Sequence, residues 1–222
     1  MGGSLIPLVF SATVLAQSPI PTDFNRHPDV RPMLAQRSAT DDRRQFNELL
    51  RQGKAYVDNG NFPQAIAIYQ QAATLDGENA ELFGSMGYLY ARQGQFAEAS
   101  QSFQQALRVN PNNPDYYDGL GFSYARQGLL NEAASAYATA VSLGPSSRQS
   151  VKYRLALGII MLQQGDYNRV RQLYNEIHRL QSDNEEAAVM MGAALLQSSE
   201  YEQLITFNNQ ALRLFPNRSE LT

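Results

Sequence analysis

Apolar and polar positions follow a helical period from about Thr40 to the end of the chain. Apolar residues recur every three or four positions, which places them on one face of an α-helix. A period of 34 residues lies on top of this pattern, because Tyr90–Gly94 is repeated at Tyr124–Gly128. With three extra residues at 148–150, this period predicts five repeats of two antiparallel helices: 46–79, 80–113, 114–147, 151–184 and 185–218. We expect residues 41–218 to form about ten helices of roughly 12–15 residues.

Glycine marks the expected end of the first helix in four repeats, at Gly60, Gly94, Gly128 and Gly165. Glycine adopts the left-handed conformation that often ends a helix, so Ser199, at this place in the fifth repeat, should form a poorer cap. Proline is expected to end three of the second helices, at Pro111, Pro145 and Pro216.

A second series of glycines lies in the middle of each first helix, at Gly53, Gly87, Gly121, Gly158 and Gly192. Glycine inside a helix costs about 1 kcal/mol relative to alanine, so five such residues in register need a shared reason. We expect a neighbouring helix to approach closely there, with Ala65, Ala99 and Ala133 facing the contact.

These repeated positions resemble the pattern of the tetratricopeptide repeat family. The second repeat matches it at Met86-Gly87, Tyr90, Gly94, Phe96, Ala99, Phe103, Ala106 and Pro111, and the third has Leu120-Gly121, Tyr124, Gly128, Leu130, Ala133, Tyr137, Ala140 and Pro145. The resemblance implies an all-α fold, an α-solenoid of about five helix-turn-helix repeats that forms a right-handed superhelix. The fourth and fifth repeats depart from the pattern at Val170, Ile177, Leu204 and Asn208. We therefore expect these two repeats to pack less regularly.

The residues before the repeats divide into two segments. Residues 1–16 contain the short apolar run Leu5–Ala16, which has the length of a signal-peptide core and ends in small residues, although no basic residue precedes it. Residues 17–40 hold Pro19, Pro21, Pro28 and Pro32, a density that predicts a flexible linker without a helix. The repeat domain is then expected to cover residues 41–222. Export to a bacterial periplasm or comparable lumen follows if 1–16 is a signal peptide, and a cytoplasmic location if it is not.

Composition narrows the chemistry. The chain has 222 residues, no cysteine, two histidines and a formal net charge of −3, which disfavours a nucleic-acid partner and excludes cysteine-based metal sites and nucleophiles. The sequence has no Gly-rich phosphate loop, nucleophile elbow or His-Glu-x-x-His pattern. We therefore predict no catalytic, cofactor-binding or metal site and no enzymatic activity. We also expect no stable transmembrane span after processing, because Leu5–Ala16 is shorter than the roughly 20 residues that a helical span needs.

A binding surface follows from the helical geometry. At 100° per residue, repeat positions 2, 5, 9, 12 and 13 of each first helix lie opposite the packing positions. The resemblance implies that this opposite face lines a concave groove. There the sequence places an apolar row, Tyr88, Phe122 and Ile159, and the expected site for a protein or peptide is completed by the charged residues Lys54, Arg92, Asp118 and Arg126. These side chains could instead only cover neighbouring helices.

Three functions remain open at this stage. The first is a non-enzymatic scaffold or adaptor that binds a protein or peptide segment in the groove and assists assembly of an exported or membrane-associated complex. The second is a homo-oligomeric structural protein, with self-association through the C-terminal repeat, where the second helix carries Leu204, Ile205, Phe207, Leu212, Leu214 and Phe215. The third is a regulatory module for an enzyme on another chain.

Overall fold

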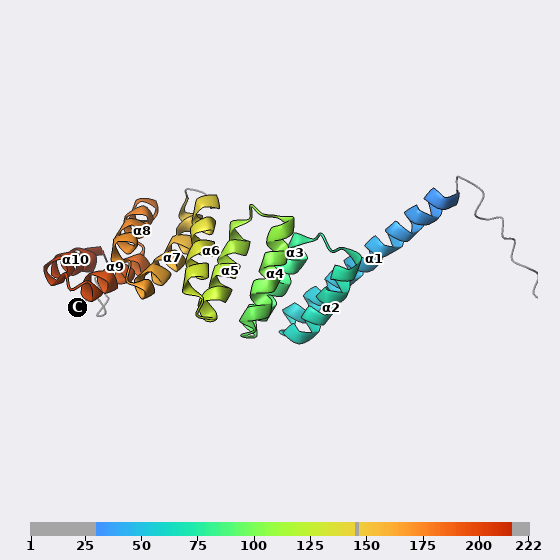
Figure 1. Cartoon of the computed structure of the whole chain (residues 1–222), viewed down its shortest axis with the longest axis horizontal. Coiled ribbons are helices and arrows are strands. Elements are labelled where there is room, and N and C mark those ends of the chain that lie inside the picture. Colours follow the sequence, from blue (N-terminus) through green and yellow to red (C-terminus); the bar gives the residue numbers. More distant parts are fainter. Residues whose placement is uncertain (1–29, 145–146, 215–222) are drawn as a thin grey trace, which may run out of the picture. The chain divides into compact units, whose positions relative to one another are not determined.

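The computed structural model describes residues 30–144 and 147–214 (Figure 1). These residues form ten α-helices and one short 3-10 helix, and they contain no strand, which confirms the all-α prediction. The helices are α1 (Val30–Asp58), α2 (Phe62–Leu75), α3 (Ala80–Arg92), α4 (Phe96–Val109), α5 (Pro114–Arg126), α6 (Leu130–Leu143), α7 (Val151–Gln164), α8 (Tyr167–Leu180), α9 (Glu185–Gln197) and α10 (Tyr201–Leu214). The 3-10 helix, Arg148–Ser150, contains the three extra residues between the third and fourth repeats.

The linker expected at 17–40 is wrong over residues 30–40, which belong to helix α1. Pro32 is the third residue of α1, and in the first turn a missing N–H removes no intrahelical hydrogen bond. After Pro32 the segment consists mostly of residues that favour helices, so α1 extends over 29 residues. The remainder of the linker, the segment 1–16 and the prolines Pro145 and Pro216 lie outside the described residues. The chain divides into two compact units within α1, between Arg44 and Gln45.

In the second unit, 45–222, each helix from α2 to α10 packs against the next in the chain, and the first helices α3, α5, α7 and α9 also contact one another in sequence (Figure 1). The turns inside the repeats follow the prediction. Gly60, Gly94, Gly128 and Gly165 have φ between +72° and +79°, and Ser199 adopts φ +62° at the same place in the fifth repeat. Among the described residues Ser199 is the one non-glycine residue with positive φ.

The mid-helix glycines make room for a side chain of the second helix rather than for its alanines. A Cβ on Gly87 would lie 3.0 Å from the ring of Phe103, and one on Gly121 would lie 2.9 Å from the ring of Tyr137. Gly53 faces Tyr69 in the same way. The alanines Ala65, Ala99 and Ala133 are fully buried beside these rings. The glycine series therefore reflects a ring-against-backbone contact in each of the first three repeats.

The first three repeats are also joined by a recurring hydrogen bond. Gln70 Nε2 donates to Tyr90 Oη over 3.0 Å, and Gln104 Nε2 donates to Tyr124 Oη over 2.7 Å, each time across 20 residues. Ala138 and Met161 stand at the corresponding positions of the third and fourth repeats, and they cannot form this bond, because the alanine side chain has no donor. The regular geometry thus changes after the third repeat.

The fourth repeat packs differently, as its sequence departures predicted. Gly158 faces Met190 and Leu173, whereas Tyr174, at the repeat position of Phe103 and Tyr137, lies edge-to-face with Phe207 of α10. The fully buried residues of α8 are Val170, Leu173 and Ile177. Alanines occupy these positions in the third repeat, where the aromatic ring packs on the mid-helix glycine. In the fourth repeat the larger side chains fill that space.

Candidate functional site

The predicted apolar row lies on three consecutive first helices, and all three side chains are exposed. Tyr88 of α3 is 58% exposed, Phe122 of α5 is 40% exposed and Ile159 of α7 is 50% exposed. Val189 and Leu196 extend the set along α9. We call the exposed side of α3, α5, α7 and α9 that carries these residues the first-helix face. Its apolar side chains stand on rigid helices, which fixes their spacing.

Tyr88 lines a hollow of about 440 Å³ between the first and third repeats, which we call the N-terminal hollow. Gly84 leaves space in its wall, because a Cβ there would lie 2.5 Å from the ring of Tyr116. The lining residues are Val57, Tyr69, Glu81, Gly84, Ser85, Tyr88, Leu89 and Tyr116. Tyr116 and Glu81 were missed in the selection of candidate residues, although Glu81 occupies one of the helix positions that defined the face.

Ile159 lines a second, larger hollow of about 600 Å³ beside α7 and α9, which we call the C-terminal hollow. Its lining residues are Ile159, Leu162, Gln181, Asp183, Asn184, Glu185, Glu186, Val189, Met190 and Ala193. Equivalent repeat positions line the two hollows. In each hollow, one first helix contributes residues at repeat positions 9 and 12, or at 12 alone. The first helix of the following repeat contributes the residues at positions 2, 5 and 9. The helical spacing in the sequence therefore identifies half of the residues that line each hollow.

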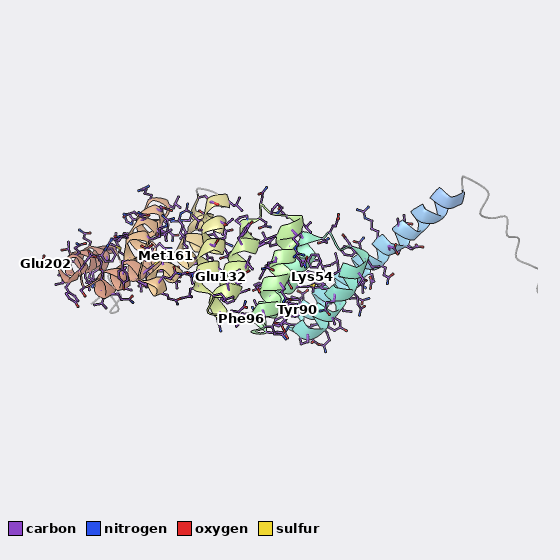
Figure 2. The ribbon with its side chains drawn as sticks, in the orientation of Figure 1. Lys54, Tyr90, Phe96, Glu132, Met161 and Glu202 are labelled. Atoms are coloured by element: carbon purple, nitrogen blue, oxygen red, sulfur yellow. The ribbon has the colours of Figure 1, made fainter. Side chains whose placement is uncertain are left out.

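Phe122 is positioned by contacts with the preceding repeat. Its ring lies edge-to-face with Phe96, the first residue of α4, which is labelled in Figure 2, and 5.9 Å separate the two centroids. The guanidinium of Arg126 lies 4.6 Å from the centroid of Phe96 and 5.8 Å from that of Phe122. Arg92 stacks in the same way on Phe62, at 5.4 Å. Cation–π contacts of this kind hold both arginines at defined places on the surface.

The other charged candidates are engaged in ion pairs. Lys54 Nζ lies 2.9 Å from Asp58 Oδ2, one helical turn away on α1 (Figure 2). Asp118 Oδ2 lies 3.9 Å from Lys152 Nζ, and the same ammonium donates to Asp115 Oδ1 over 2.5 Å. Burial raises the pKa of the Asp118 carboxyl. The pKa of Asp115 is lowered, because Lys152 and Tyr153 both donate hydrogen bonds to its Oδ1.

The seven candidate residues therefore do not form one pocket. Two separate hollows are lined by Tyr88 and by Ile159. Aromatic clusters contain Phe122, Arg92 and Arg126. Asp118 belongs to the ion-pair network around Lys152. The arrangement offers exposed apolar anchors and charges on a rigid surface, which suits the binding of a polypeptide. Within residues that the structure describes, no three Asp, Glu or His side chains are grouped so that they could hold a metal ion.

Comparison with known families places these observations in context. A family model described as "TPR repeat" matches residues 53–94 and 87–128. The matched span contains the glycines of the first three turns and the mid-helix glycines of the first three repeats, with the packed rings of Tyr69 and Phe103. This chain is a tetratricopeptide repeat protein.

Solved structures of TPR and related proteins share the fold of this TPR protein at low sequence identity. The MamA protein is 18% identical, with a TM-score of 0.72 over 77% of this chain and 91% of that chain. YrrB, described as a TPR protein with an unusual peptide-binding site, is 18% identical, with a TM-score of 0.68 over 78% and 88%. A tetratricopeptide repeat protein from Parabacteroides merdae is 19% identical, with a TM-score of 0.71 over 80% and 70%. A search of curated proteins found no match.

TPR repeats form modules that bind proteins or peptides. In the described part of this TPR protein, no helix combines the length and apolar character that crossing a membrane requires. The fourth and fifth repeats lie beyond the span of the family match, and their helix pairs are defined by the structure.

Proposed function

We propose that this protein is a non-enzymatic scaffold that binds a protein or peptide segment along its first-helix face. The observation that carries the proposal is the exposure of Tyr88, Phe122 and Ile159 on three consecutive first helices. Single exposed apolar residues are ordinary on a protein surface, but an uncovered row across adjacent helices is characteristic of an interaction site.

Two features of the face support this proposal. Aromatic residues and arginine are the commonest hot spots of protein interfaces, and Tyr88, Phe122 and Arg126 provide both kinds. The two hollows provide recesses into which apolar side chains of a partner could insert. YrrB, which shares the fold, is itself described as having a peptide-binding site.

The test begins with crosslinking and mass spectrometry in the native host to identify a partner, whose affinity is then measured with purified proteins. We expect Tyr88→Ala combined with Phe122→Ala to weaken binding, by about 2 kcal/mol for each anchor that is a hot spot. The matched control combines Leu129→Ala and Leu143→Ala, which remove exposed apolar side chains elsewhere. Unchanged affinity in a folded Tyr88→Ala, Phe122→Ala variant would move the site away from the first-helix face.

We further propose that the scaffold is exported and assists assembly of an exported or membrane-associated complex. The apolar run Leu5–Ala16, which ends in Val14-Leu15-Ala16, supports removal of residues 1–16 by a signal peptidase. Intact-mass analysis of the protein from its native host tests this directly. A mature chain that retains Leu5–Ala16 would contradict cleavage.

A second candidate function is self-association through α10. Tyr201 and Ile205 are 57% and 63% exposed, whereas Ile66 and Ser100, which occupy the position of Ile205 in the first two repeats, are each 6% exposed. Sedimentation of the protein beside a Tyr201→Ser, Ile205→Ser variant tests this function. Phe207 is unsuitable for that variant because its ring packs against Tyr174, with 5.5 Å between the centroids. A parent protein that remains monomeric at high concentration would exclude self-association.

A further inference from the structure

The C-terminal hollow combines an apolar floor with an acidic rim. Five apolar residues from α7 and α9 form the floor: Ile159, Leu162, Val189, Met190 and Ala193. Val189 is 44% exposed and Ile159 is 50% exposed, so the floor lacks a cover within the described structure. At about 600 Å³, the hollow is large enough for an aliphatic or aromatic side chain of a partner together with part of its backbone.

The charged residues that line this hollow all carry the same sign. They are Asp183 in the turn before α9 and Glu185 and Glu186 in the first turn of α9, and the lining contains no lysine or arginine. The N-terminal end of a helix stabilises carboxylates in their ionised form. Asp183 is paired with Arg148 at 3.3 Å, but both side chains are about 70% exposed, so this pair neutralises the rim weakly.

The cationic residue of α7 on the first-helix face does not line the C-terminal hollow and pairs elsewhere. Lys152 lies on the same helix as Ile159, but its ammonium is bound by Asp115 and lies near Asp118. By contrast, the N-terminal hollow contains a single acidic residue, Glu81, in its lining. An excess of negative charge therefore distinguishes the C-terminal hollow from the other recess of the same face.

We propose that the C-terminal hollow binds a basic peptide segment, with an apolar side chain on the floor and an adjacent lysine or arginine against Glu186. This inference rests on the proposed function and specifies the partner chemistry at one end of the first-helix face. The apolar contact provides most of the affinity, and the charges provide selectivity and faster association, since complementary potentials steer the encounter. An acidic segment would place like charges together at the rim and bind more weakly.

The experiment selects peptides from a random library displayed on phage, with the full chain as the target. The enriched peptides are synthesised, and their affinities are measured for the parent and for Val189→Asp, Glu186→Gln and Glu186→Lys. Glu132→Lys makes the same charge change as Glu186→Lys on an exposed residue of α6, outside the hollow, and serves as the matched control (Figure 2). Thermal melts establish that each variant is folded, and Glu186 is exposed, so its substitution leaves the core intact.

We expect enriched peptides to share an apolar residue next to lysine or arginine. Glu186→Lys should weaken their binding about five- to tenfold, Glu186→Gln less, and Glu132→Lys hardly at all, with weaker binding at high salt. Enrichment of acidic or uncharged peptides, or of none, would overturn the inference. Equal affinities for the parent, Val189→Asp and Glu186→Lys would do the same. If Tyr88→Ala with Phe122→Ala then abolished binding, the proposed function would stand while this inference failed.

Discussion

Arg154 and Glu176 join the two helices of the fourth repeat through an ion pair whose arginine is largely buried. Nε of Arg154 donates to Oε2 of Glu176 over 3.0 Å, and a second guanidinium nitrogen donates to Ser150 Oγ over 2.6 Å. The Arg154 side chain is only 11% exposed. It occupies the repeat position at which Phe83 and Tyr117 stand in the second and third repeats. A polar cluster thus replaces an aromatic contact where the regular packing changes.

We predict that Arg154→Ala lowers the free energy of unfolding by about 3 kcal/mol, because it leaves Glu176 and Ser150 without their buried partner. Arg169 is the matched control, since it lies 3.8 Å from the other oxygen of Glu176 and is more exposed. Arg169→Ala should cost about 0.5 kcal/mol or less. Chemical denaturation measures both, and a smaller loss for Arg154→Ala than for Arg169→Ala would contradict the prediction.

The left-handed conformation of Ser199 predicts a stabilising substitution. A non-glycine residue in this region destabilises the folded state by about 1–2 kcal/mol. Glycine removes this strain, but it also increases the conformational entropy of the unfolded chain, which offsets part of the gain. Ser199→Gly should therefore raise the free energy of unfolding by about 0.5–1 kcal/mol. The reverse change at an equivalent turn, Gly165→Ser, should lower it by a similar amount. The sign of each shift in thermal or chemical denaturation decides the matter, and destabilisation by Ser199→Gly would show that other contacts stabilise this turn.

Two glycines at the same repeat position should respond in opposite directions to alanine. A Cβ on Gly121 would lie 2.9 Å from Tyr137, so Gly121→Ala should destabilise the protein by about 1–2 kcal/mol after the gain in helix propensity. A Cβ on Gly192 would have its nearest neighbour at 3.9 Å, an ordinary contact. Gly192→Ala should therefore stabilise by up to about 1 kcal/mol. Melting temperatures of the pair provide the test, and shifts of equal sign would refute it.

The carboxylates around Lys152 predict opposite dependences on pH. Hydrogen bonds from Lys152 and Tyr153 lower the folded-state pKa of Asp115. The stabilisation that Asp115 contributes to the folded state is therefore fully present above its unfolded pKa, about 3.9, and is lost as pH falls through the folded value. Burial raises the pKa of Asp118, so its contribution decreases as pH rises through the interval between the unfolded and folded values.

We therefore expect Asp115→Asn to lower the melting temperature at pH 7. In acid, the variant and the parent should have the same melting temperature. Asp118→Asn should leave the melting temperature at pH 7 unchanged or raise it, because it removes a carboxylate whose ionised form burial disfavours. Melting curves recorded between neutral and acidic pH measure both differences. A constant difference between the parent and Asp115→Asn at all pH values would contradict the assignment.

Local patterns in the sequence are sufficient to predict the helices and turns of the repeats and the residues of the exposed face. Helical periodicity and a left-handed glycine are local properties, since they depend on residues within a few positions along the chain. For this reason the repeat period located Gly60, Gly94, Gly128 and Gly165, and it identified Ser199 as the departure. The same period placed Tyr88, Phe122 and Ile159 on the exposed side of the first helices.

The contacts of each side chain depend on how the helices pack in three dimensions. The ring of Phe122 lies against Phe96 from the preceding repeat, and Lys152 pairs with Asp115 across 37 residues. Such choices depend on the distance and orientation of separate helices, which a helical period does not specify. The helix over residues 30–40 was not predicted, because the density of prolines indicated a linker. Pro32 lies in the first turn of α1, where a proline is compatible with a helix. The two separate hollows on the predicted face are a further example, because long-range packing determines where its side chains leave space.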